Sequence, residues 1–494
     1  MQPDTSFYAA LAGRLEGRTA AIVLSSKDVS LTGPDLLSKV EIWAAALAGN
    51  GVQAGDRVAV QVEKSMEVVL LYLAVLRLGA VYVPLNTAYR SAEVAYFLAD
   101  AEPRLLVCDP ADAVAHAQHG VSLLTLDKNG RGSLADTVVA DHPQPPRHAA
   151  IADDLAAIVY TSGTTGRSKG AMITHRNLLS NALALIATWR IDPKDTLLHV
   201  LPLYHIHGLF IALNTMLLAT AHTRLLTAFD AEAVFTELPD ATVFMGVPTY
   251  YTRLLADQRL DRSTTAGVRL FVCGSAPLTP ATFDAFHQRT GQQILERYGM
   301  SECGVICSNP IDGPRLAGAV GPPLPGTEVR LSGGGERGVL EVRGDNVCAG
   351  YWRQPDKTAA EFLGDGFFIT GDIATIDDDG VVRIVGREKD LIISGGLNIY
   401  PKEIELVIDL LDEVDEAAVI GLPHADFGEA VIALVRLNPG ASLDQAALIE
   451  RLRPVLAGFK LPKAVFIVDE LPRNAMGKVQ KALLREQFTS RFKG

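Results

Sequence analysis

The stretch that most restricts the fold of this chain is a loop rich in glycine, serine and threonine: Tyr160-Thr161-Ser162-Gly163-Thr164-Thr165-Gly166-Arg167-Ser168-Lys169-Gly170. It follows the apolar run Leu155 to Val159, which is typical of a buried strand, and it precedes residues 171–189, which have helical character. A loop between a strand and a helix can present successive backbone N–H groups and hydroxyls to a polyphosphate. Lys169 adds a point charge for the outer phosphates. The sequence therefore predicts a phosphate-binding loop rather than a flexible surface linker.

Length and composition limit the class of protein. A chain of 494 residues is too long for a single hydrophobic core, so we expect two or more domains. A hydrophobic fraction of 48% and a charged fraction of 21% are ordinary for a globular protein. The formal net charge of −12 argues against a general nucleic-acid binder, which needs a basic face, but it permits a local pocket for an anionic small ligand.

The cysteines and the apolar runs indicate the compartment. The five cysteines are scattered and odd in number, which fits reduced thiols in the cytoplasm better than a disulfide framework. Cys303 and Cys307 lack a second ligand pair at zinc spacing. Residues 1–15 contain no signal-peptide apolar segment, and the most apolar run, residues 68–85, is interrupted by Arg77. We therefore expect a cytoplasmic protein with neither a membrane nor a nucleic-acid partner.

Periodicity predicts an α/β protein with a large N-terminal domain and a small C-terminal domain. Helix-like and strand-like runs alternate in residues 20–150, which indicates largely parallel sheets covered by helices. Residues 111–150 have little periodicity and are interpreted as a variable surface connection. After Pro322, short strands and turns indicate a small β-rich subdomain. We place the domain boundary so that residues 1–388 form the large domain and 389–494 a compact α+β unit.

Several polar positions suit a nucleotide-dependent reaction. Residues 296–302, Glu-Arg-Tyr-Gly-Met-Ser-Glu, are interpreted as a charged and aromatic loop that ends in a carboxylate. Glu302 is the best candidate for a Mg²⁺ ligand, because Mg²⁺ binds one or two carboxylates together with phosphate oxygens. Asp372 follows an expected strand and tight turn, where a carboxylate can accept hydrogen bonds from both ribose hydroxyls. Arg387 follows another strand and is expected to reach the ribose or the α-phosphate.

Read in order, these motifs resemble those of the adenylate-forming enzymes: acyl-CoA synthetases, luciferases and the adenylation domains of peptide synthetases. The resemblance covers essentially the whole chain, and three further segments carry it: Leu201-Pro202-Leu203-Tyr204-His205-Ile206-His207-Gly208, residues 386–405, and Pro472-Arg473-Asn474-Ala475-Met476-Gly477-Lys478. It implies that an acid reacts with ATP to give an acyl-adenylate and pyrophosphate, and that coenzyme A then takes the acyl group. The implied cofactors are Mg²⁺, ATP and coenzyme A.

The resemblance also implies roles for individual residues. The catalytic set is Lys478, which bridges the acid's carboxylate and the α-phosphate, together with Thr161 and Glu302 at Mg²⁺ and His205 near the acyl group. Lys389 is the hinge of a mobile C-terminal domain, and Ser394, Gly395 and Gly396 approach the pantetheine chain of coenzyme A. The positions matched to ATP and AMP contacts are Thr161, Ser162, Gly163, Thr164, Thr165, Lys169, Gly274, Ser275, Ala276, Glu296, Arg297, Tyr298, Gly299, Met300, Ser301, Asp372, Arg387 and Lys478.

Residues 84–89, 244–255 and 421–429 resemble the malonyl-CoA synthetases within this family. Arg253 lies on an expected helix that begins at Pro248, and a buried guanidinium suits a dicarboxylate, whose unreactive carboxylate needs a forked donor. The resemblance places Ser275 and His205 beside that carboxylate. The predicted acid is malonate, with methylmalonate or another short dicarboxylate left open, because residues 303–309 are more apolar than the matching run of malonate-using relatives.

Three alternatives remain at this point: a ligase for a short-chain or aryl monocarboxylate, an adenylation module that loads a carrier protein, and a non-catalytic paralogue. We expect no carrier domain after Gly494, which weakens the second, and the presence of Lys478, Glu302 and Asp372 argues against the third. The context of Lys478 also resembles sites of regulatory lysine acylation. We therefore expect a lysine acyltransferase and a deacylase to act on Lys478, because acylation removes its charge.

Overall fold

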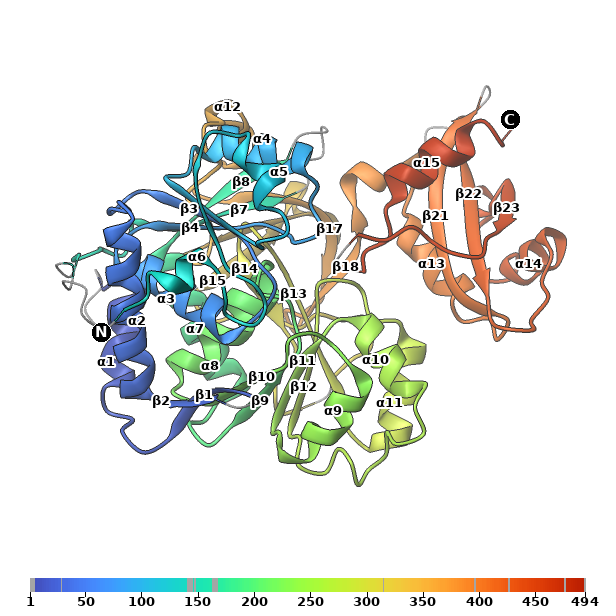
Figure 1. Ribbon diagram of the computed structural model, residues 1–494. Coiled ribbons are helices and arrows are strands. Elements are labelled where there is room, and N and C mark those ends of the chain that lie inside the picture. The colour runs from blue at the N-terminus through green and yellow to red at the C-terminus, as the bar shows by residue number, and fades with distance from the viewer. Residues whose placement is uncertain are drawn as a thin grey trace.

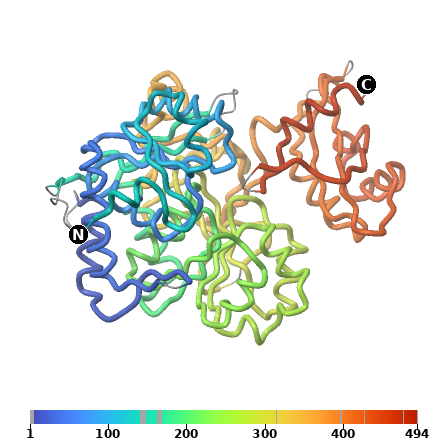
Figure 2. The backbone as a smooth tube through the Cα atoms, in the orientation of Figure 1, coloured from blue at the N-terminus to red at the C-terminus, as the bar shows by residue number. Residues whose placement is uncertain are grey.

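The structure is a computed structural model that describes residues 5–27, 29–139, 145, 148–161, 168–313, 315–394, 397–424, 427–474 and 477–492. A large body contains three sheets, and a smaller C-terminal unit, coloured orange to red, lies beside it (Figure 1). The backbone tube shows the same separation into two lobes (Figure 2). This arrangement confirms the predicted α/β class.

The first large sheet has six strands and is parallel except at one edge. The neighbours β3, β4, β5, β6 and β7 run parallel, and β8 is antiparallel to β7. In spatial order the strands are β6 (Ser122–Thr125), β5 (Leu105–Cys108), β3 (Arg57–Gln61), β4 (Val81–Pro84), β7 (Leu155–Thr161) and β8 (Lys169–Thr174).

The second large sheet has eight strands, of which only the two edge strands, β2 and β14, are antiparallel to their neighbours. In spatial order they are β14 (Gly304–Ser308), β13 (Ile294–Met300), β12 (Leu270–Cys273), β11 (Val243–Gly246), β9 (Thr196–His199), β10 (His222–Leu225), β1 (Ile22–Ser26) and β2 (Val29–Thr32).

The main hydrophobic core lies between these two sheets. Along β11, Val243 and Met245 belong to this central core, whereas Phe244 belongs to a second core on the outer face of the same sheet. Helices α3 (Met66–Arg77), α7 (His175–Trp189) and α8 (Asn214–Leu218) contribute to the central core, and every residue of α3 except Glu67 is buried. Because both faces of each sheet are covered, the strands read as continuous apolar runs.

The outer faces are covered by further helices. Residues of α9 (Ala231–Glu237), α10 (Pro248–Leu255) and α11 (Pro280–Thr290) pack on the eight-stranded sheet, and α4 (Ser91–Ala101) packs on the six-stranded sheet. The remaining helical segments of the large body are α1 (Phe7–Leu15), α2 (Gly33–Gly49), α5 (Ala113–Ala117), α6 (Ser133–Asp136), the π-helix η1 (His207–Leu213) and the 3₁₀ turns η2 (Leu238–Asp240) and η3 (Ser332–Gly334).

A four-stranded antiparallel sheet corresponds to the predicted β-rich subdomain. Its strands are β15 (Thr327–Leu331), β16 (Arg337–Gly344), β17 (Phe368–Ile376) and β18 (Val382–Arg387), with α12 (Pro355–Glu361) between β16 and β17. The C-terminal unit then comprises η4 (Glu388–Asp390), β19 (Ile392–Ser394), β20 (Leu397–Ile399), α13 (Pro401–Ile408), β21 (Val414–His424), β22 (Gly428–Leu437), α14 (Gln445–Leu452), η5 (Gly458–Lys460), β23 (Ala464–Ile467) and α15 (Lys481–Thr489). The predicted boundary at residue 388/389 falls in η4 and remains a prediction.

Three local predictions are wrong. Residues 169–174 form strand β8, so the phosphate loop joins two antiparallel strands rather than a strand and a helix. Residues 296–300 belong to strand β13 rather than to a loop, and Asp372 lies within β17 rather than after a strand. In each case backbone pairing with a distant or following strand, which local periodicity does not report, fixes the conformation.

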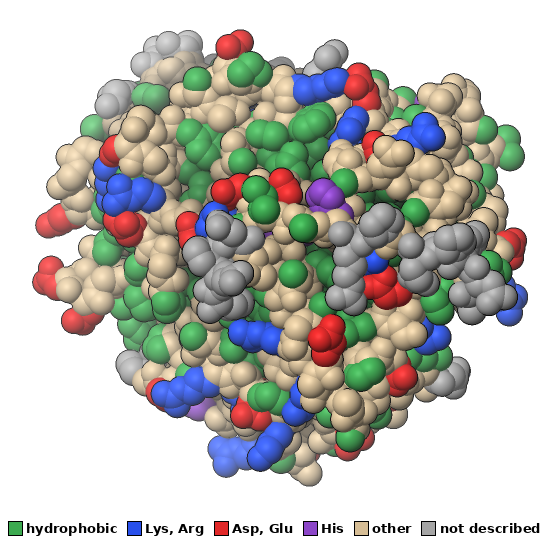
Figure 3. Space-filling view, turned by 90° about the vertical axis from the view of Figure 1, so that its left-hand side faces the viewer, with side chains coloured by type: hydrophobic (Ala, Val, Ile, Leu, Met, Phe, Trp, Pro, Cys, Tyr) green, Lys and Arg blue, Asp and Glu red, His purple; other side chains and the backbone are tan. Residues whose placement is uncertain are grey.

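The face seen in Figure 3, which is on the left in Figure 1, has acidic and basic side chains interspersed rather than gathered by sign. In the part of the chain that the structure describes, no helix is both long enough and apolar enough to span a bilayer.

We expect Arg269→Met to destabilise the protein by about 2 kcal/mol, because it removes the ion partner of a buried carboxylate. Asp195 is 4% exposed and accepts a hydrogen bond of 2.9 Å from Arg269 Nε. Burial raises the pKa of Asp195, but the bonds from Arg269 and other donors outweigh it, so the pKa lies below its usual value. The deficit of the variant, measured by denaturant unfolding at several pH values, should shrink below about pH 4 as the carboxyl protonates. Equal stability of both proteins at pH 7 would contradict this account.

Candidate active site

Of the phosphate loop, residues 160–170, the structure describes only the two ends. Residues 162–167, which include the predicted contacts Ser162, Gly163, Thr164 and Thr165, lie outside the described residues. Thr161 ends β7, and its Oγ1 donates a hydrogen bond of 3.2 Å to Glu302 Oε1. At the other end, Tyr96 donates to the Ser168 carbonyl at 2.7 Å. The structure thus brings Thr161 and Glu302, which are 141 positions apart, into one site.

Lys169 is buried and already has an anionic partner. Its Nζ lies 2.6 Å from Glu361 Oε1 at the end of α12 and 4.3 Å from the centre of the Tyr351 ring. Tyr351 Oη in turn lies 2.6 Å from Glu361 Oε2 and 3.3 Å from Glu302 Oε1. The sequence predicts that Lys169 binds the outer phosphates. In this structure its ammonium instead pairs with Glu361, and this pair helps to hold the side chains around Glu302 in place.

Glu302 has the properties of a carboxylate that lacks a full counter-charge. It is 5% exposed, and burial raises its pKa although Lys169 and the Thr161 hydroxyl act in the opposite direction. The described residues contain no group of three or more His, Cys, Asp or Glu side chains that could hold a metal by themselves. A buried carboxylate beside one hydroxyl fits Mg²⁺, which completes its shell with phosphate oxygens and water.

The nucleotide end of the site is formed by three strands. Asp372 on β17 is 3% exposed, Tyr298 of β13 donates a hydrogen bond of 2.5 Å to its Oδ2, and Arg387 Nε of β18 lies 3.0 Å from its Oδ1. The carboxylate raises the pKa of Arg387. The structure thus brings together three residues that the sequence assigned to ATP or AMP, although their ribose and phosphate contacts remain predictions.

The remaining residues of the predicted nucleotide motifs surround β12 and β13. A Cβ on Gly274 would lie 2.4 Å from the Arg297 guanidinium, which would have to shift, and a Cβ on Gly299 would lie 2.0 Å from the Gly304 carbonyl oxygen, so position 299 requires glycine. Glu296 is buried and accepts a hydrogen bond from the Gly318 N–H, and burial raises its pKa to about 7. The other members, which are all partly exposed, are Ala276, Met300 and Ser301.

Lys478 reaches this site from the C-terminal unit. Its loop touches the large body, since a Cβ on Gly477 would lie 3.4 Å from Thr249 Cγ2 of α10. Burial, together with the cations of Arg387 and Arg297, lowers the pKa of Lys478 to about 8, although the carboxylates of Asp372 and Glu302 act in the opposite direction. The lysine therefore lies among the residues assigned to the nucleotide and Mg²⁺.

The loop that carries Lys478 is fastened by its own neighbours. The Lys478 N–H donates to Asn474 Oδ1 at 3.0 Å, and Arg473 Nη1 donates to the Gly477 carbonyl at 2.6 Å. Arg473 also forms an ion pair with Glu416 of β21. This pairing connects the loop to the C-terminal sheet, so the sheet and the lysine should move as one body.

Two histidines lie near Ser275, in the segment that the sequence assigned to the acyl group. His205 Nδ1 accepts from the His207 N–H at 3.2 Å, and His207 Nδ1 lies 3.1 Å from Ser275 Oγ. Burial, with the cations of Lys478 and Arg297, lowers the pKa of His205 to about 3, and His207 is also held well below its usual pKa. Both imidazoles are thus neutral at pH 7, and His205 and Ser275 lie in one region as predicted.

A buried pair that the sequence argument missed supports this segment. Lys64 Nζ lies 2.7 Å from His199 Nδ1 and 2.6 Å from the His199 carbonyl, and His199 Nε2 lies 2.8 Å from the Gly208 carbonyl. Because a carbonyl only accepts, His199 Nε2 carries the proton and its Nδ1 accepts from Lys64. The pair fixes the start of π-helix η1, a rare conformation that is often found at functional sites. In the sequence, the only signal for the Lys64–His199 pair is that His199, at the end of β9, lies shortly before residues 201–208.

Arg253 does not occupy a buried position, so that expectation is wrong. On α10 the side chains of Tyr251 and Leu254 face the core, which turns Arg253 outward to an exposed position. Its guanidinium carbon lies 5.9 Å from the centre of the Phe229 ring, and Phe229 stacks on Tyr250. Within the described residues it has no carboxylate partner.

The predicted coenzyme A residues lie in the C-terminal unit. Ser394 ends β19 and is 7% exposed, whereas Gly395 and Gly396 lie outside the described residues. Lys389 is exposed in the η4 turn that leads from β18 into this unit. Its position between the two lobes suits a hinge, which remains a prediction.

Comparison with known proteins defines the class. The family model of the AMP-binding enzyme matches residues 10–352, and that of the AMP-binding enzyme C-terminal domain matches residues 403–478. The chain therefore belongs to the AMP-binding enzymes, and it is an AMP-forming acid–thiol ligase of that family.

Particular relatives are similar over most or all of their length. The crystal structure of ATP-bound MatB from Rhodopseudomonas palustris is 48% identical, covers 99% of this chain and 100% of its own, and superposes with a TM-score of 0.95. The mitochondrial malonate–CoA ligase of Mus musculus is 36% identical, with 83% of this chain and 78% of the relative covered. A feruloyl-CoA synthase of Amycolatopsis is also 36% identical, with 93% and 94% covered.

We expect the rate of acyl-adenylate formation to fall as the pH rises through about 8, because Lys478 then loses the proton that makes it a cation. The fall should approach tenfold per pH unit above that point. Acid-dependent exchange of pyrophosphate into ATP, followed from pH 6.5 to 9.5, measures this half-reaction. Transfer from preformed acyl-adenylate to coenzyme A serves as the control, and a fall of the same size in the control would contradict the assignment to Lys478.

Proposed function

We propose that this protein is a malonate–CoA ligase, which activates malonate with ATP and transfers the malonyl group to coenzyme A. The observation that carries the proposal is the position of Lys478, partly exposed and within electrostatic reach of Arg297, Asp372 and Glu302, in a chain similar along its whole length to ATP-bound MatB. The similarity to the mouse malonate–CoA ligase supports the same acid.

In the first half-reaction a carboxylate oxygen of malonate attacks the α-phosphorus of ATP, and the bond from that phosphorus to the pyrophosphate oxygen breaks. Malonyl-AMP and pyrophosphate result. Lys478 stabilises the negative charge that develops on the α-phosphate and orients the attacking carboxylate. Asp372 and Arg387 hold the ribose and phosphate side of the nucleotide.

Glu302 and the Thr161 hydroxyl would hold Mg²⁺, which supplies positive charge to the phosphates of ATP. The chain's own contribution is to orient Glu302. Tyr351, Lys169 and Glu361 form the surrounding network that fixes this carboxylate in a buried setting.

In the second half-reaction the sulfur of coenzyme A attacks the carbonyl carbon of malonyl-AMP, and AMP leaves. We propose that the C-terminal unit first rotates at Lys389, withdraws Lys478 and presents residues 394–396 to the pantetheine chain. The ATP-bound relative superposes with a TM-score of 0.95 and the apo structure of the same relative with 0.83. The higher score for the ATP-bound structure supports the view that the two lobes of this chain are oriented as in the first half-reaction, in which ATP is bound.

The similarity to feruloyl-CoA synthase favours, as a second candidate, a ligase for an aryl monocarboxylate. The two candidates differ in whether the site must receive one negative charge or two. Methylmalonate and other short dicarboxylates, loading of a carrier protein, and acylation of Lys478 by a partner enzyme remain predictions from the sequence.

The test measures AMP release with ATP, coenzyme A and each of malonate, methylmalonate, succinate, acetate, butyrate and benzoate. We expect the two malonates to have the highest kcat/KM. We expect Lys478→Ala to lower pyrophosphate exchange with malonate by two orders of magnitude or more, which is about 3 kcal/mol, because charge on the α-phosphate loses its partner. The same variant should still transfer malonyl from preformed malonyl-AMP. A preference for benzoate or butyrate would replace the proposal by its second candidate.

A further inference from the structure

Lys64 is a buried amine that the proposed mechanism does not use. It lies between β3 and α3, directly before the residue that caps α3, and it is 5% exposed. Its Nζ lies 2.7 Å from His199 Nδ1 and 2.6 Å from the His199 carbonyl oxygen. Burial lowers the pKa of Lys64 well below its usual value, and no carboxylate among the described residues acts in the opposite direction.

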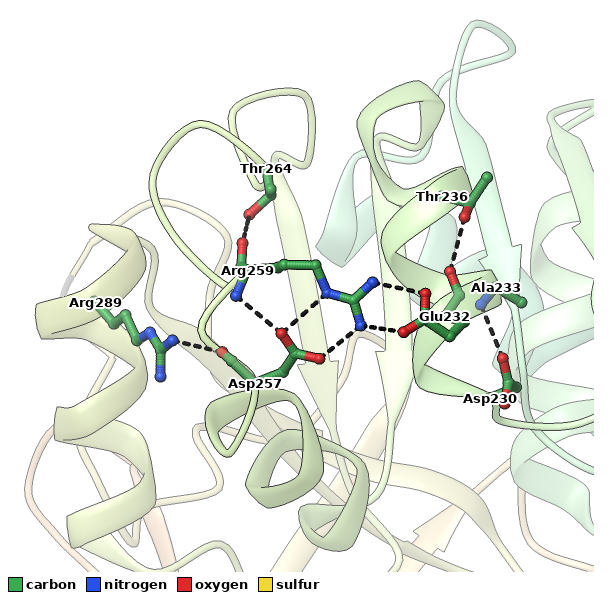
Figure 4. A network of polar contacts seen from close by, with 8 residues as sticks. All are labelled: Asp230, Glu232, Ala233, Thr236, Asp257, Arg259, Thr264 and Arg289. Carbon is green, nitrogen blue, oxygen red and sulfur yellow. Dashed lines mark hydrogen bonds and ion pairs between the residues drawn. The ribbon is translucent and has the colours of Figure 1, made fainter.

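Other cations of the chain show the usual solution. Arg77, at the end of α3, is 3% exposed and pairs with a glutamate of α2 at 2.8 Å. The surface Arg259 is held by two carboxylates, those of Asp257 and Glu232, through both of its terminal nitrogens (Figure 4). Lys64 is buried like Arg77 but contacts only an imidazole and a carbonyl. Because burying an amine is costly, an apolar side chain would serve better if the position only had to fill space.

His199 transmits the contact of Lys64 to the acyl segment, residues 201–208. Its Nε2 carries the proton and donates to the Gly208 carbonyl at 2.8 Å, while its Nδ1 accepts from Lys64. The His199 carbonyl also accepts from the Leu226 N–H at 3.0 Å, which fixes the backbone at the end of β9. Lys64 therefore holds the ring and the backbone of His199 in one orientation, and the ring closes residues 199–208 into a loop.

The closed loop contains both histidines of the acyl segment. The His205 carbonyl accepts from the Gly208 N–H at 3.1 Å, and His207 Nδ1 lies 3.1 Å from Ser275 Oγ. A Cβ on Gly208 would lie 2.0 Å from the Pro202 carbonyl oxygen, so the segment is folded tightly on itself. A displacement of Gly208 would therefore move both imidazoles.

We propose that Lys64 is a positioning residue for the acid: through His199 and Gly208 it fixes the loop that presents the two imidazoles to the acyl group. The inference goes beyond the proposed function, which gives Lys64 no role, and it rests on that function only for the identity of the acid. The predicted ribose and Mg²⁺ contacts lie on β7, β17 and β18 and directly after β13, outside this loop. Loss of Lys64 should therefore affect the acid more than ATP.

The test measures the KM for malonate and the KM for ATP separately in Lys64→Met, which has an unbranched apolar side chain. We expect the KM for malonate to rise about tenfold, the effect of losing roughly one buried hydrogen bond, while the KM for ATP changes less than about twofold. Arg77→Met is the matched control, because it also removes a buried cation but at the other end of α3. It should leave both KM values unchanged.

Three outcomes would overturn the inference. One is an equal rise of both KM values in Lys64→Met, and another is no rise in either. The third is the same difference between the two KM values in Arg77→Met, since the difference would then report lost stability. If the wild type prefers another acid of the panel, the proposed function fails, but the test is run with that acid, so the two failures are distinguishable.

Two substitutions of His199 cover the case in which Lys64→Met does not fold. The amide nitrogen of Gln can take the place of His Nε2, so His199→Gln still donates to Gly208, whereas the shorter His199→Asn can contact only Lys64. We expect His199→Asn to raise the KM for malonate about tenfold and His199→Gln to raise it much less. Malonate should also raise the melting temperature of His199→Asn less than that of His199→Gln. Equal values in the two variants would contradict a role for loop closure.

Discussion

The proposed chemistry depends on the approach of Lys478, which is partly exposed on a loop of the C-terminal unit, to charged residues of the large body. The ammonium lies within electrostatic reach of Asp372 and Glu302, which attract it, and of Arg387 and Arg297, which repel it. Burial strengthens all of these interactions, because little solvent screens them. Under the proposed function, a lysine on a loop of the C-terminal unit is the group that receives the charge of the α-phosphate. Its position also couples the chemistry to the orientation of that unit.

Both faces of the two large sheets are covered, and the apolar surface buried there stabilises the fold against the cost of burying charged side chains. Strands from the two sheets and from the small antiparallel sheet meet where the site lies: Thr161 at the end of β7 contacts Glu302, which follows β13, and Tyr298 within β13 contacts Asp372 within β17. Apolar layers on either side exclude water from the strands themselves. The polar groups that remain inside are then held by each other, as in the contacts among Lys169, Glu361 and Tyr351.

Two kinds of buried charge are present. Lys64 and Lys169 have acceptors from the chain, and they fix the backbone at η1 and the surroundings of Glu302. Arg297 and Glu302 are incompletely compensated, and they lie where an anionic substrate and a cation are expected. The hydrogen-bonded side chains of the first kind orient the site, whereas the incompletely compensated ones are the candidate positions for ligands.

The sequence by itself determined the α/β class, most of the strands and helices, and the motifs that name Lys478, Glu302 and Asp372. These follow from local patterns, because the period of apolar residues reports burial along one segment. The tertiary structure decided which arginine is buried: α10 turns Arg253 outward, while β13 encloses Arg297 between two other strands. It also decided that Lys169 pairs with Glu361 and that Lys64 pairs with His199. Burial and pairing of a charge depend on segments far apart in the chain, and no local pattern records which segments those are.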